Sequence, residues 1–243
     1  MSATGTSWPW QRLNDSNANA HGVLATLLDP QPGERWLDVG TGGGGVAFLL
    51  ARGGATVVGV DIAEDGLAHA REAAAAEGLP VRFEYGDAQE LPFEDASFDG
   101  VASAFGVMFA PDAERAAQEL ARVCRPGGKL GLTLMPMDSR AGEMFSALGR
   151  YGGGSPHPAR WSEDVERLLG EAFALEVERR DSPAHRHPPH PWEESVRSFA
   201  PLRELVERLD DDRVVALRAE LEALDERYQR VAPSYFVVLG RRR

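Results

Sequence analysis

A short apolar segment that runs directly into a cluster of glycines constrains this chain more than any other feature. Residues 36–39 (WLDV) precede residues 40–45 (GTGGGG), and residues 46–51 are apolar and rich in alanine and leucine. This pattern predicts a strand, a tight turn and a helix. Glycine allows the backbone to approach a ligand closely, and a helix that begins at the turn directs its free N–H groups toward it. We therefore expect the turn to bind a cofactor with polar or negatively charged groups.

Strand and helix patterns alternate through residue 135, which indicates a parallel sheet with helices on both faces. The expected strands are 36–39, 56–61, 81–85, 98–103 and 129–135, and the expected helices are 46–52, 63–77 and 112–123. The last third adds helices at 140–148, 162–172, 192–209 and 211–230 and strands at 173–180 and 235–240. The prediction is an α/β fold: a Rossmann-like, doubly wound, mostly parallel seven-stranded sheet with helical cap insertions.

The chain reads as a single domain over residues 1–243. Residues 34–135 form the expected cofactor-binding core, 136–232 a substrate cap that contributes one strand to the sheet, and 233–241 the final strand. Residues 1–33, with a helix expected from Asn19, have two interpretations. They form either an arm that packs its tryptophans on the core or a lid from which Trp8, Trp10 or Arg12 contacts the ligand.

Composition narrows the class of partner. The formal net charge of −12 argues against nucleic acid, because phosphate binding relies on clustered lysine and arginine. Cys124 is the only cysteine, so no intrachain disulfide forms, and its place at a helix end before Arg125 and Pro126 predicts a buried, inert thiol. The chain shows neither a signal peptide nor a membrane-spanning run. We expect a cytoplasmic monomer or homodimer that acts on a small molecule away from membranes.

The glycines alone leave the cofactor open. Gly40, Gly42 and Gly45 satisfy the dinucleotide pattern GxGxxG, and Asp61 follows at about the distance of a ribose-binding acid. Asp38 favours another ligand, because a carboxylate two residues before the turn suits a cation and fits poorly beside a pyrophosphate. Asp87, after the third strand, is a further acid that a dinucleotide site does not need.

The ends of the first four strands are expected to converge on one crevice, because ligands of open parallel sheets bind outside the carboxyl ends where strand order reverses. These ends are Gly40, Asp61, the segment 86–88 (GDA) and the segment 103–106 (SAFG).

The order of these features resembles the class I S-adenosylmethionine-dependent methyltransferases over residues 36–135. The resemblance is strongest to the small-molecule group of type 11/25, which carries an LPF-x-x-x-x-FD stretch, here residues 91–99 (LPFEDASFD). Residues 125–128 (RPGG) and 105–109 (FGVMF) are also typical of that group.

The resemblance implies S-adenosylmethionine as cofactor and assigns roles to individual residues. Asp38, Gly40, Thr41 and Gly42 would hold the methionine part. Asp61 would accept hydrogen bonds from both ribose hydroxyls, and Ile62 would pack against adenine. Asp87 would bind the adenine amine, the Ala88 backbone N–H would donate to a ring nitrogen, and Phe105 would lie near the transferred methyl. The implied reaction is methyl transfer to an oxygen, nitrogen or carbon nucleophile of a small metabolite.

Residues that would contact the substrate are harder to assign. No catalytic base is identified; His157 and Tyr151 are weak candidates. Candidates for substrate contact are Trp8, Trp10, Met108, Arg160 and Trp161. His185, His187 and His190 resemble a metal cluster, but no cysteine or carboxylate joins them at ligand spacing, so we expect no metal. Two alternatives stay open: an NAD(P)-dependent oxidoreductase, and a non-catalytic module that binds the cofactor.

Overall fold

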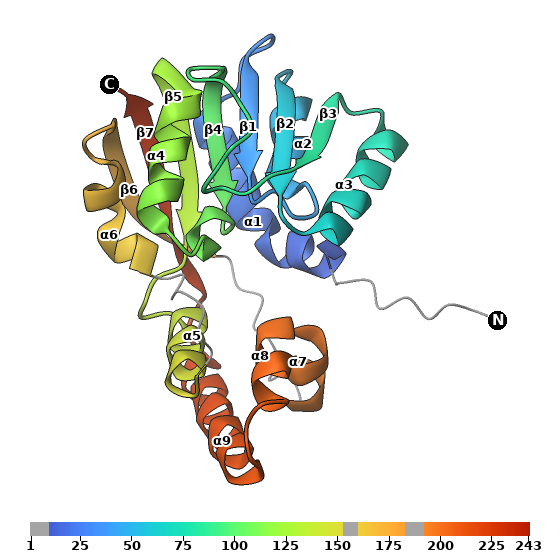
Figure 1. The fold of residues 1–243 in the computed structure, drawn as a ribbon, viewed down its shortest axis with the longest axis vertical. Coiled ribbons are helices and arrows are strands. Elements are labelled where there is room, and N and C mark those ends of the chain that lie inside the picture. Colours follow the sequence, from blue (N-terminus) through green and yellow to red (C-terminus); the bar gives the residue numbers. More distant parts are fainter. Residues whose placement is uncertain (1–9, 153–159, 183–191) are drawn as a thin grey trace, which may run out of the picture.

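The computed structural model describes residues 10–152, 160–182 and 192–243 (Figure 1). The strands are β1 (Arg35–Val39), β2 (Thr56–Asp61), β3 (Val81–Tyr85), β4 (Phe98–Ala104), β5 (Cys124–Leu134), β6 (Phe173–Asp181) and β7 (Ser234–Arg242). The helices are α1 (Trp10–Leu28), α2 (Gly45–Arg52), α3 (Glu64–Glu77), η1 (Val107–Phe109, a 3-10 helix), α4 (Ala113–Val123), α5 (Arg140–Arg150), α6 (Arg160–Leu169), α7 (Trp192–Ser198), α8 (Ala200–Val206) and α9 (Asp211–Tyr228).

The strands form one seven-stranded sheet in the order β3-β2-β1-β4-β5-β7-β6. Strands β1 to β5 pair in parallel, and β7 runs antiparallel to both β5 and β6. The order reverses at β1, because the chain first builds outward to β3 and then returns to place β4 on the other side. The predicted Rossmann-like, mostly parallel sheet with seven strands is confirmed. The reversal predicts a ligand crevice at the ends of β1 and β4.

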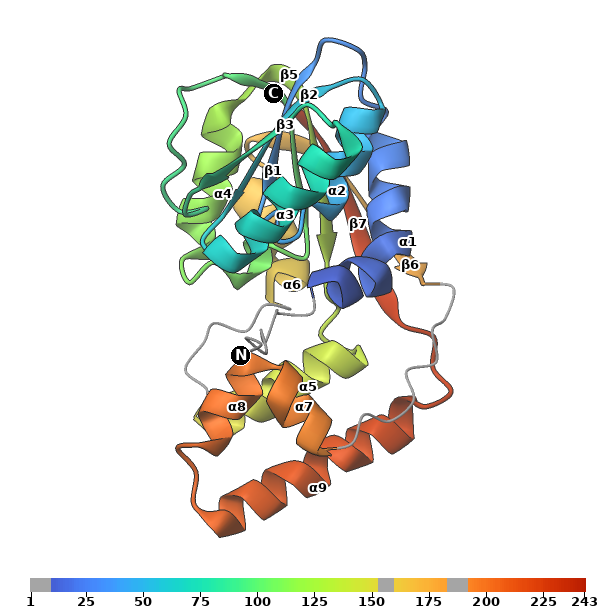
Figure 2. The same ribbon diagram turned by 90° about the vertical axis from the view of Figure 1, so that its right-hand side faces the viewer.

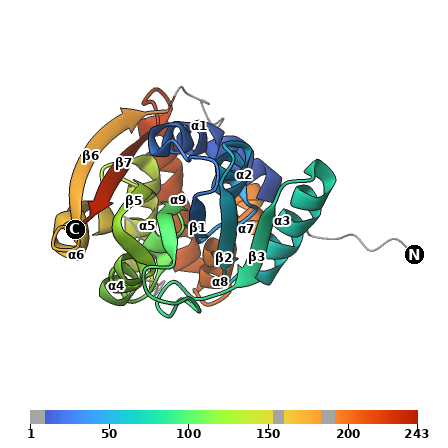
Figure 3. The same ribbon diagram turned by 90° about the horizontal axis from the view of Figure 1, so that it is seen from above.

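Helices cover both faces of the sheet, so its central strands are apolar on both sides. Successive residues of β1 show this: Trp36 packs with α1, α2 and α3, whereas Leu37 packs with α4 and α6. Seen from above, α1 and α2 lie on one face and α4 and α6 on the other (Figure 3). The two resulting hydrophobic clusters hold the sheet rigid beneath the crevice.

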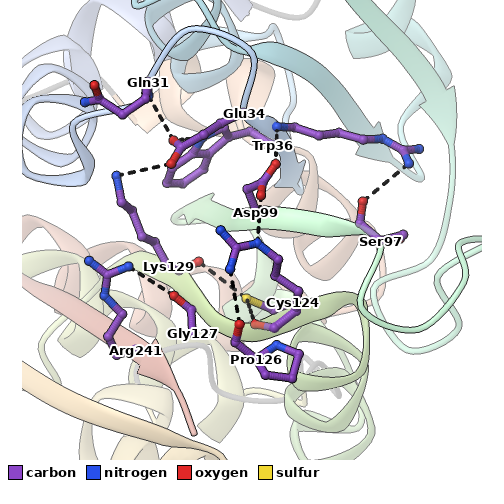
Figure 4. Close-up of polar contacts among 12 residues, drawn as sticks. Gln31, Glu34, Trp36, Ser97, Asp99, Cys124, Pro126, Gly127, Lys129 and Arg241 are labelled. Carbon is purple, nitrogen blue, oxygen red and sulfur yellow. Dashed lines mark hydrogen bonds and ion pairs between the residues drawn. The ribbon is translucent and has the colours of Figure 1, made fainter.

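The amino ends of the parallel strands, opposite the expected crevice, carry a polar network (Figure 4). Asp99 accepts hydrogen bonds from the backbone N–H of Arg35 and from Arg125 Nε, both at 2.7 Å. Lys129 Nζ donates to the carbonyl of Leu28 at 2.9 Å. The segment 125–128 (RPGG) therefore lies at the amino ends of the parallel strands and has a structural role. Cys124 is buried beside it, and burial raises the pKa of its thiol to about 11.

A separate group of helices lies beyond the carboxyl ends of the parallel strands (Figures 1 and 2). Helices α5, α7, α8 and α9 enclose their own hydrophobic cluster, centred on Leu148, Leu202, Leu205 and Leu217. This arrangement agrees with the expected cap insertions. The division of the chain into one domain with arm, core and cap stays a prediction.

Two helix boundaries differ from the sequence prediction. The helix expected over 192–209 is divided at Phe199, because Pro201 lies at the start of α8 and lacks the N–H that a continuous helix needs. Helix α1 begins at Trp10, well before the expected start at Asn19. Tyr235 on β7 ties α1 to the sheet, since its hydroxyl donates to Asn19 Oδ1 at 3.2 Å.

A polar cluster joins the cap to the sheet where α5 begins and α9 ends. Arg179 on β6 donates to Asp138 Oδ2 at 2.8 Å and to Ser234 Oγ at 2.9 Å. The hydroxyl of Tyr228, at the end of α9, lies 2.6 Å from Glu143 Oε1 and 2.9 Å from the Asp138 carbonyl. These contacts link β6, β7, α5 and α9, and they hold the cap over the strand ends.

The backbones of Gly40 and Gly106 cross in direct contact at the ends of β1 and β4. A Cβ on Gly106 would lie 2.6 Å from the Gly40 oxygen, and a Cβ on Gly40 would lie 2.6 Å from the Gly106 Cα. Ser103 fixes the crossing, because its Oγ donates to the Val39 carbonyl at 2.6 Å and accepts from the Val107 N–H at 2.8 Å. Only glycine permits this approach at either position.

The loop after β3 is held by an ion pair on α4 between the buried Glu119 and the half-buried Arg122. Glu119 Oε2 accepts from the Leu91 N–H at 2.7 Å and from Arg122 Nη2 at 2.7 Å. Arg122 in turn donates to the carbonyls of Leu91 (3.0 Å) and Phe93 (2.7 Å). The segment 91–93 (LPF) thus takes its path from α4, which the sequence alone did not indicate.

We predict that Gly106→Ala destabilises the fold by about 1–3 kcal/mol, because the new methyl group would overlap the Gly40 backbone. Chemical denaturation measures the change. Gly149→Ala is the matched control: no atom lies within 4 Å of its added Cβ, and alanine favours the helix α5. Equal stability of Gly106→Ala and the wild type would contradict the close crossing.

We also predict that Glu119→Ala lowers the free energy of unfolding by about 1–3 kcal/mol, because it removes the acceptor of the Leu91 N–H and one of the two carboxylates paired with Arg122. The control is Glu114→Ala on the same helix, whose carboxylate pairs with Arg167 on the exposed surface. The control should unfold like the wild type. If both variants unfold alike, the Glu119–Arg122 pair does not hold the loop.

Candidate functional site

Backbone hydrogen bonds bring the ends of neighbouring strands together into one rim. The N–H groups of Gly40 and Thr41 donate to the Val60 carbonyl at 2.9 and 3.0 Å, which joins the ends of β1 and β2. The Gly86 N–H donates to the Asp61 carbonyl at 3.1 Å, and the Phe105 N–H donates to the Thr133 carbonyl at 3.1 Å. The strand ends predicted to converge therefore do so.

Asp38 lies beneath the glycine turn. Its side chain is 1% exposed, and Oδ2 accepts from Thr41 Oγ1 at 2.7 Å and from the Ala47 N–H at 3.1 Å. These bonds brace the turn from strand to helix. Gly40 and Gly42 adopt left-handed backbone conformations, with φ of 68° and 50°. Asp38 and Thr41 thus shape the turn with their side chains, and their direct contact with a cofactor stays a prediction.

Asp61 connects the glycine turn to the end of β2. Oδ2 accepts from the Gly42 N–H at 2.8 Å, and Oδ1 accepts from the Ala63 N–H at 2.9 Å. Because each carboxylate oxygen can accept a second hydrogen bond, both oxygens keep capacity for hydroxyl donors. The side chain is partly buried, and this placement leaves room for the bidentate role that the resemblance implies.

Burial makes both carboxyls difficult to ionise. It raises the pKa of Asp38 from its ordinary 3.8 to about 7, although the bonds from Thr41 and Ala47 oppose the rise. The negative charge of Asp61 adds to it, and burial also raises the pKa of Asp61 itself. No arginine or lysine of the described chain is bonded to either carboxylate. A cationic ligand would therefore be stabilised here, and a phosphate would be repelled.

An exposed apolar side chain follows directly after Asp61. Ile62 is 63% exposed, which is unusual for isoleucine at the end of a buried strand. It would gain contact from a flat apolar group bound beside the Asp61 carboxylate. This observation fits the adenine contact that the resemblance implies.

Asp87 is exposed at the next strand end, with Ala88 half-buried behind it. Asp87 Oδ1 accepts from the N–H and the side-chain Nε2 of Gln89, at 2.8 and 3.0 Å. Gln89 in turn accepts from the Asp112 N–H at 2.9 Å, so the loop is anchored to the start of α4. Exposure leaves the Asp87 carboxylate open to a ligand donor.

Phe105 is half-buried at the end of β4 and has a φ of 55°, a conformation that non-glycine residues seldom adopt. Its ring packs edge-on against Tyr235, with centroids 6.2 Å apart. The turn from Phe105 through Gly106 to η1 places Phe109 outward, 43% exposed. Phe109 belongs to the 105–109 motif but is not among the site residues predicted from the sequence.

Two of the predicted substrate contacts, Met108 and Trp161, are 1% and 2% exposed and pack in the cluster between the sheet, α4 and α6. Both also line the pocket that Arg160 borders, and their contact with substrate stays a prediction. Arg160 is exposed and borders a pocket of about 450 Å³ between η1, α4 and α6. Its contact with substrate stays a prediction.

The remaining candidates are less well placed. Tyr151 ends α5 within the cap cluster, where Arg213 lies 5.7 Å from its ring. Its role as a base stays untested. Trp8, His157, His185, His187 and His190 lie outside the described residues, and of Trp10 only the backbone is described. In the described part of the chain, no three potential ligands group as a metal site would require.

Comparison with known proteins places this geometry in a family. The model of a family described as a methyltransferase domain matches residues 37–132. A protein of uncharacterized function from Mycobacterium bovis is 36% identical over 214 residues, covering 82% of this chain and 76% of the relative. The demethylmenaquinone methyltransferase of Thermus thermophilus is 48% identical over 105 residues, covering 42% of this chain and 48% of that enzyme.

A solved structure supports the fold. Phosphoethanolamine N-methyltransferase 2 of Haemonchus contortus, in complex with S-adenosyl-L-methionine, aligns with a TM-score of 0.63 at 22% identity, covering 93% of this chain and 52% of that one. At this identity the likeness speaks for the fold alone. Together with the matched domain and the two relatives, it identifies the chain as a class I S-adenosylmethionine-dependent methyltransferase.

Proposed function

We propose that this enzyme transfers the methyl group of S-adenosylmethionine to an oxygen, nitrogen or carbon nucleophile of a small-molecule metabolite. The observation that carries the proposal is the rim of the sheet, where Asp38 and Asp61 lie together with no basic partner among the described residues and Ile62 lies exposed beside them. A phosphate-free cation with an apolar base complements this surface. The nicotinamide alternative loses support, because a pyrophosphate would meet the same two acids.

The residues present fit S-adenosylmethionine at each part of the rim. Asp61 would hold the ribose hydroxyls, Ile62 would cover one face of adenine, and Asp87 with the Ala88 N–H would bind its polar edge. The turn around Gly40 and Gly42 would carry the methionine part, close to the Phe105 ring. These assignments rest on the free lone pairs of Asp61, the exposure of Ile62 and Asp87, and the open backbone of the turn.

Methyl transfer from this cofactor requires little acid or base chemistry from the protein. The bound cofactor supplies an electrophilic methyl group on sulfur, whose leaving group is a neutral thioether that needs no acid. The residues of the rim and the cap therefore have to align the acceptor and exclude water. A general base would help only an acceptor that must lose a proton.

The acidic surface and the cap agree with a small acceptor. A net charge of −12 disfavours nucleic acid, whose backbone the protein would repel. None of the described helices is both long and apolar enough to cross a bilayer. We keep a cytoplasmic location and a monomeric or homodimeric state as part of the proposal.

Asp61→Ala is predicted to weaken binding of S-adenosylmethionine by about 2–3 kcal/mol, because the ribose hydroxyls lose a charged acceptor. Isothermal titration calorimetry measures the change. Glu64→Ala is the matched control, since it removes an exposed carboxylate three residues away. A folded Asp61→Ala variant with wild-type affinity would remove Asp61 from the ribose site.

The affinity for S-adenosylmethionine should rise with pH through about 7, because Asp38 becomes charged in this range and the ligand is a cation. The free energy of unfolding of the ligand-free protein should instead fall as the pH rises. A carboxyl whose pKa is higher in the folded chain stabilises the fold fully below pH 3.8, and this contribution is lost as the pH rises through about 7. The loss amounts to at most roughly 4 kcal/mol.

Asp38→Asn tests both effects, because asparagine keeps an oxygen acceptor for Thr41 and Ala47 but does not ionise. The variant should be more stable than the wild type at pH 8 and should bind the cofactor with little dependence on pH. Titration calorimetry and denaturation from pH 5.5 to 8.5 give both curves. Parallel curves for variant and wild type would show that Asp38 does not titrate in this range.

A further inference from the structure

Three phenylalanines from three different elements form a continuous row in the described part of the chain. The rings of Phe109 and Phe145 have centroids 5.5 Å apart at an interplanar angle of 61°, and those of Phe145 and Phe199 are 5.7 Å apart at 83°. Both pairs are edge-to-face, the arrangement that the charge distribution of aromatic rings favours.

The row runs from the rim of the sheet into the cap. Phe109 ends η1, Phe145 lies in the middle of α5, and Phe199 precedes α8. Phe109 is exposed and the other two are half-buried, so the row is not sealed in a core. The cap helices that carry Phe145 and Phe199 lie beyond the strand ends that form the cofactor rim (Figure 2).

The row begins next to the cofactor rim. Phe105 and Phe109 are separated by one tight turn, in which Gly106 contacts the Gly40 backbone of the cofactor turn. A molecule seated against Phe109 would therefore lie close to the position that the proposed function gives to the reactive methyl group.

The charged side chains of α5 are paired within the cap. Arg140 pairs with Asp225, Glu143 with Arg227, and Arg150 with Glu220. Helix α5 therefore offers this row no unpaired charge that would recognise an anionic or cationic acceptor. The side chain that α5 adds to the row, Phe145, is apolar and aromatic.

We propose that Phe109, Phe145 and Phe199 form the acceptor-binding wall and that the acceptor is a flat, uncharged aromatic molecule. Its ring continues the edge-to-face row, and its nucleophilic atom lies toward Phe105. This inference rests on the proposed function, because it names the class of small molecule that the methyltransferase uses. The wall supplies contact and orientation only; the nucleophile belongs to the acceptor.

The test measures binding of 2-naphthol and of its saturated counterpart decahydro-2-naphthol by calorimetry, with S-adenosylhomocysteine present at saturation. The wild type should bind the aromatic compound at least about tenfold more tightly, and Phe109→Leu and Phe145→Leu should each lose most of this preference. Both variants should bind S-adenosylhomocysteine like the wild type. Phe236→Leu, a partly buried ring on β7 outside the row, is the matched control.

The outcomes separate this inference from the proposed function. Equal affinity for the two compounds, or an aromatic preference that survives both substitutions, would overturn the aromatic wall. Such a result would leave the methyltransferase assignment intact provided that S-adenosylhomocysteine still binds. Failure of the wild type to bind S-adenosylhomocysteine would instead contradict the proposed function.

Discussion

The contact between the backbones of Gly40 and Gly106 is the constraint on which the rest of the site depends. Strand order reverses between β1 and β4, so the turns that leave these two strands must pass each other at one point. The pass is too close for a Cβ at either glycine, and the hydroxyl of Ser103 on β4 bonds Val39 of β1 and Val107 of η1 at that level. Because the crossing is fixed, the glycine turn on one side and Phe105 on the other keep a constant separation.

The charges of Asp38 and Asp61 determine which ligand charge this site would favour. Asp38 and Asp61 are buried close enough for their charges to interact, and their hydrogen bonds come from backbone N–H groups and one hydroxyl. A folded protein normally offsets such acids with arginine or lysine. Among the described residues neither acid has such a partner, and the proposed cationic ligand would supply the countercharge, which would couple its binding to the ionisation of the acids. The same feature lowers the stability of the free enzyme at neutral pH, a cost that functional sites often carry.

Much of the sheet and of its row of acids could be predicted from the sequence, because β1, β2 and β4 are largely buried. Continuous apolar runs such as 56–60 (TVVGV) end in a single acid, and parallel topology then brings those acids to one edge. The side-chain partners could not be predicted. Glu119 holds Leu91 at a separation of 28 positions in the sequence, and nothing in the local pattern of α4 indicates which carboxylate turns inward. Met108 and Phe109 are adjacent apolar residues, and only the path of η1 decides that one is core and the other exposed.

The cap depends on a different set of contacts from the sheet. Its hydrophobic cluster around Leu202, Leu205 and Leu217 shares no residue with the two clusters that cover the sheet. Cap and sheet are joined by the polar cluster around Arg179 and by the Phe109–Phe145 ring contact. Substitutions in the cap can therefore alter the proposed acceptor surface without disturbing the strand ends of the proposed cofactor site. This independence gives a physical reason why one cofactor rim can serve many different acceptors.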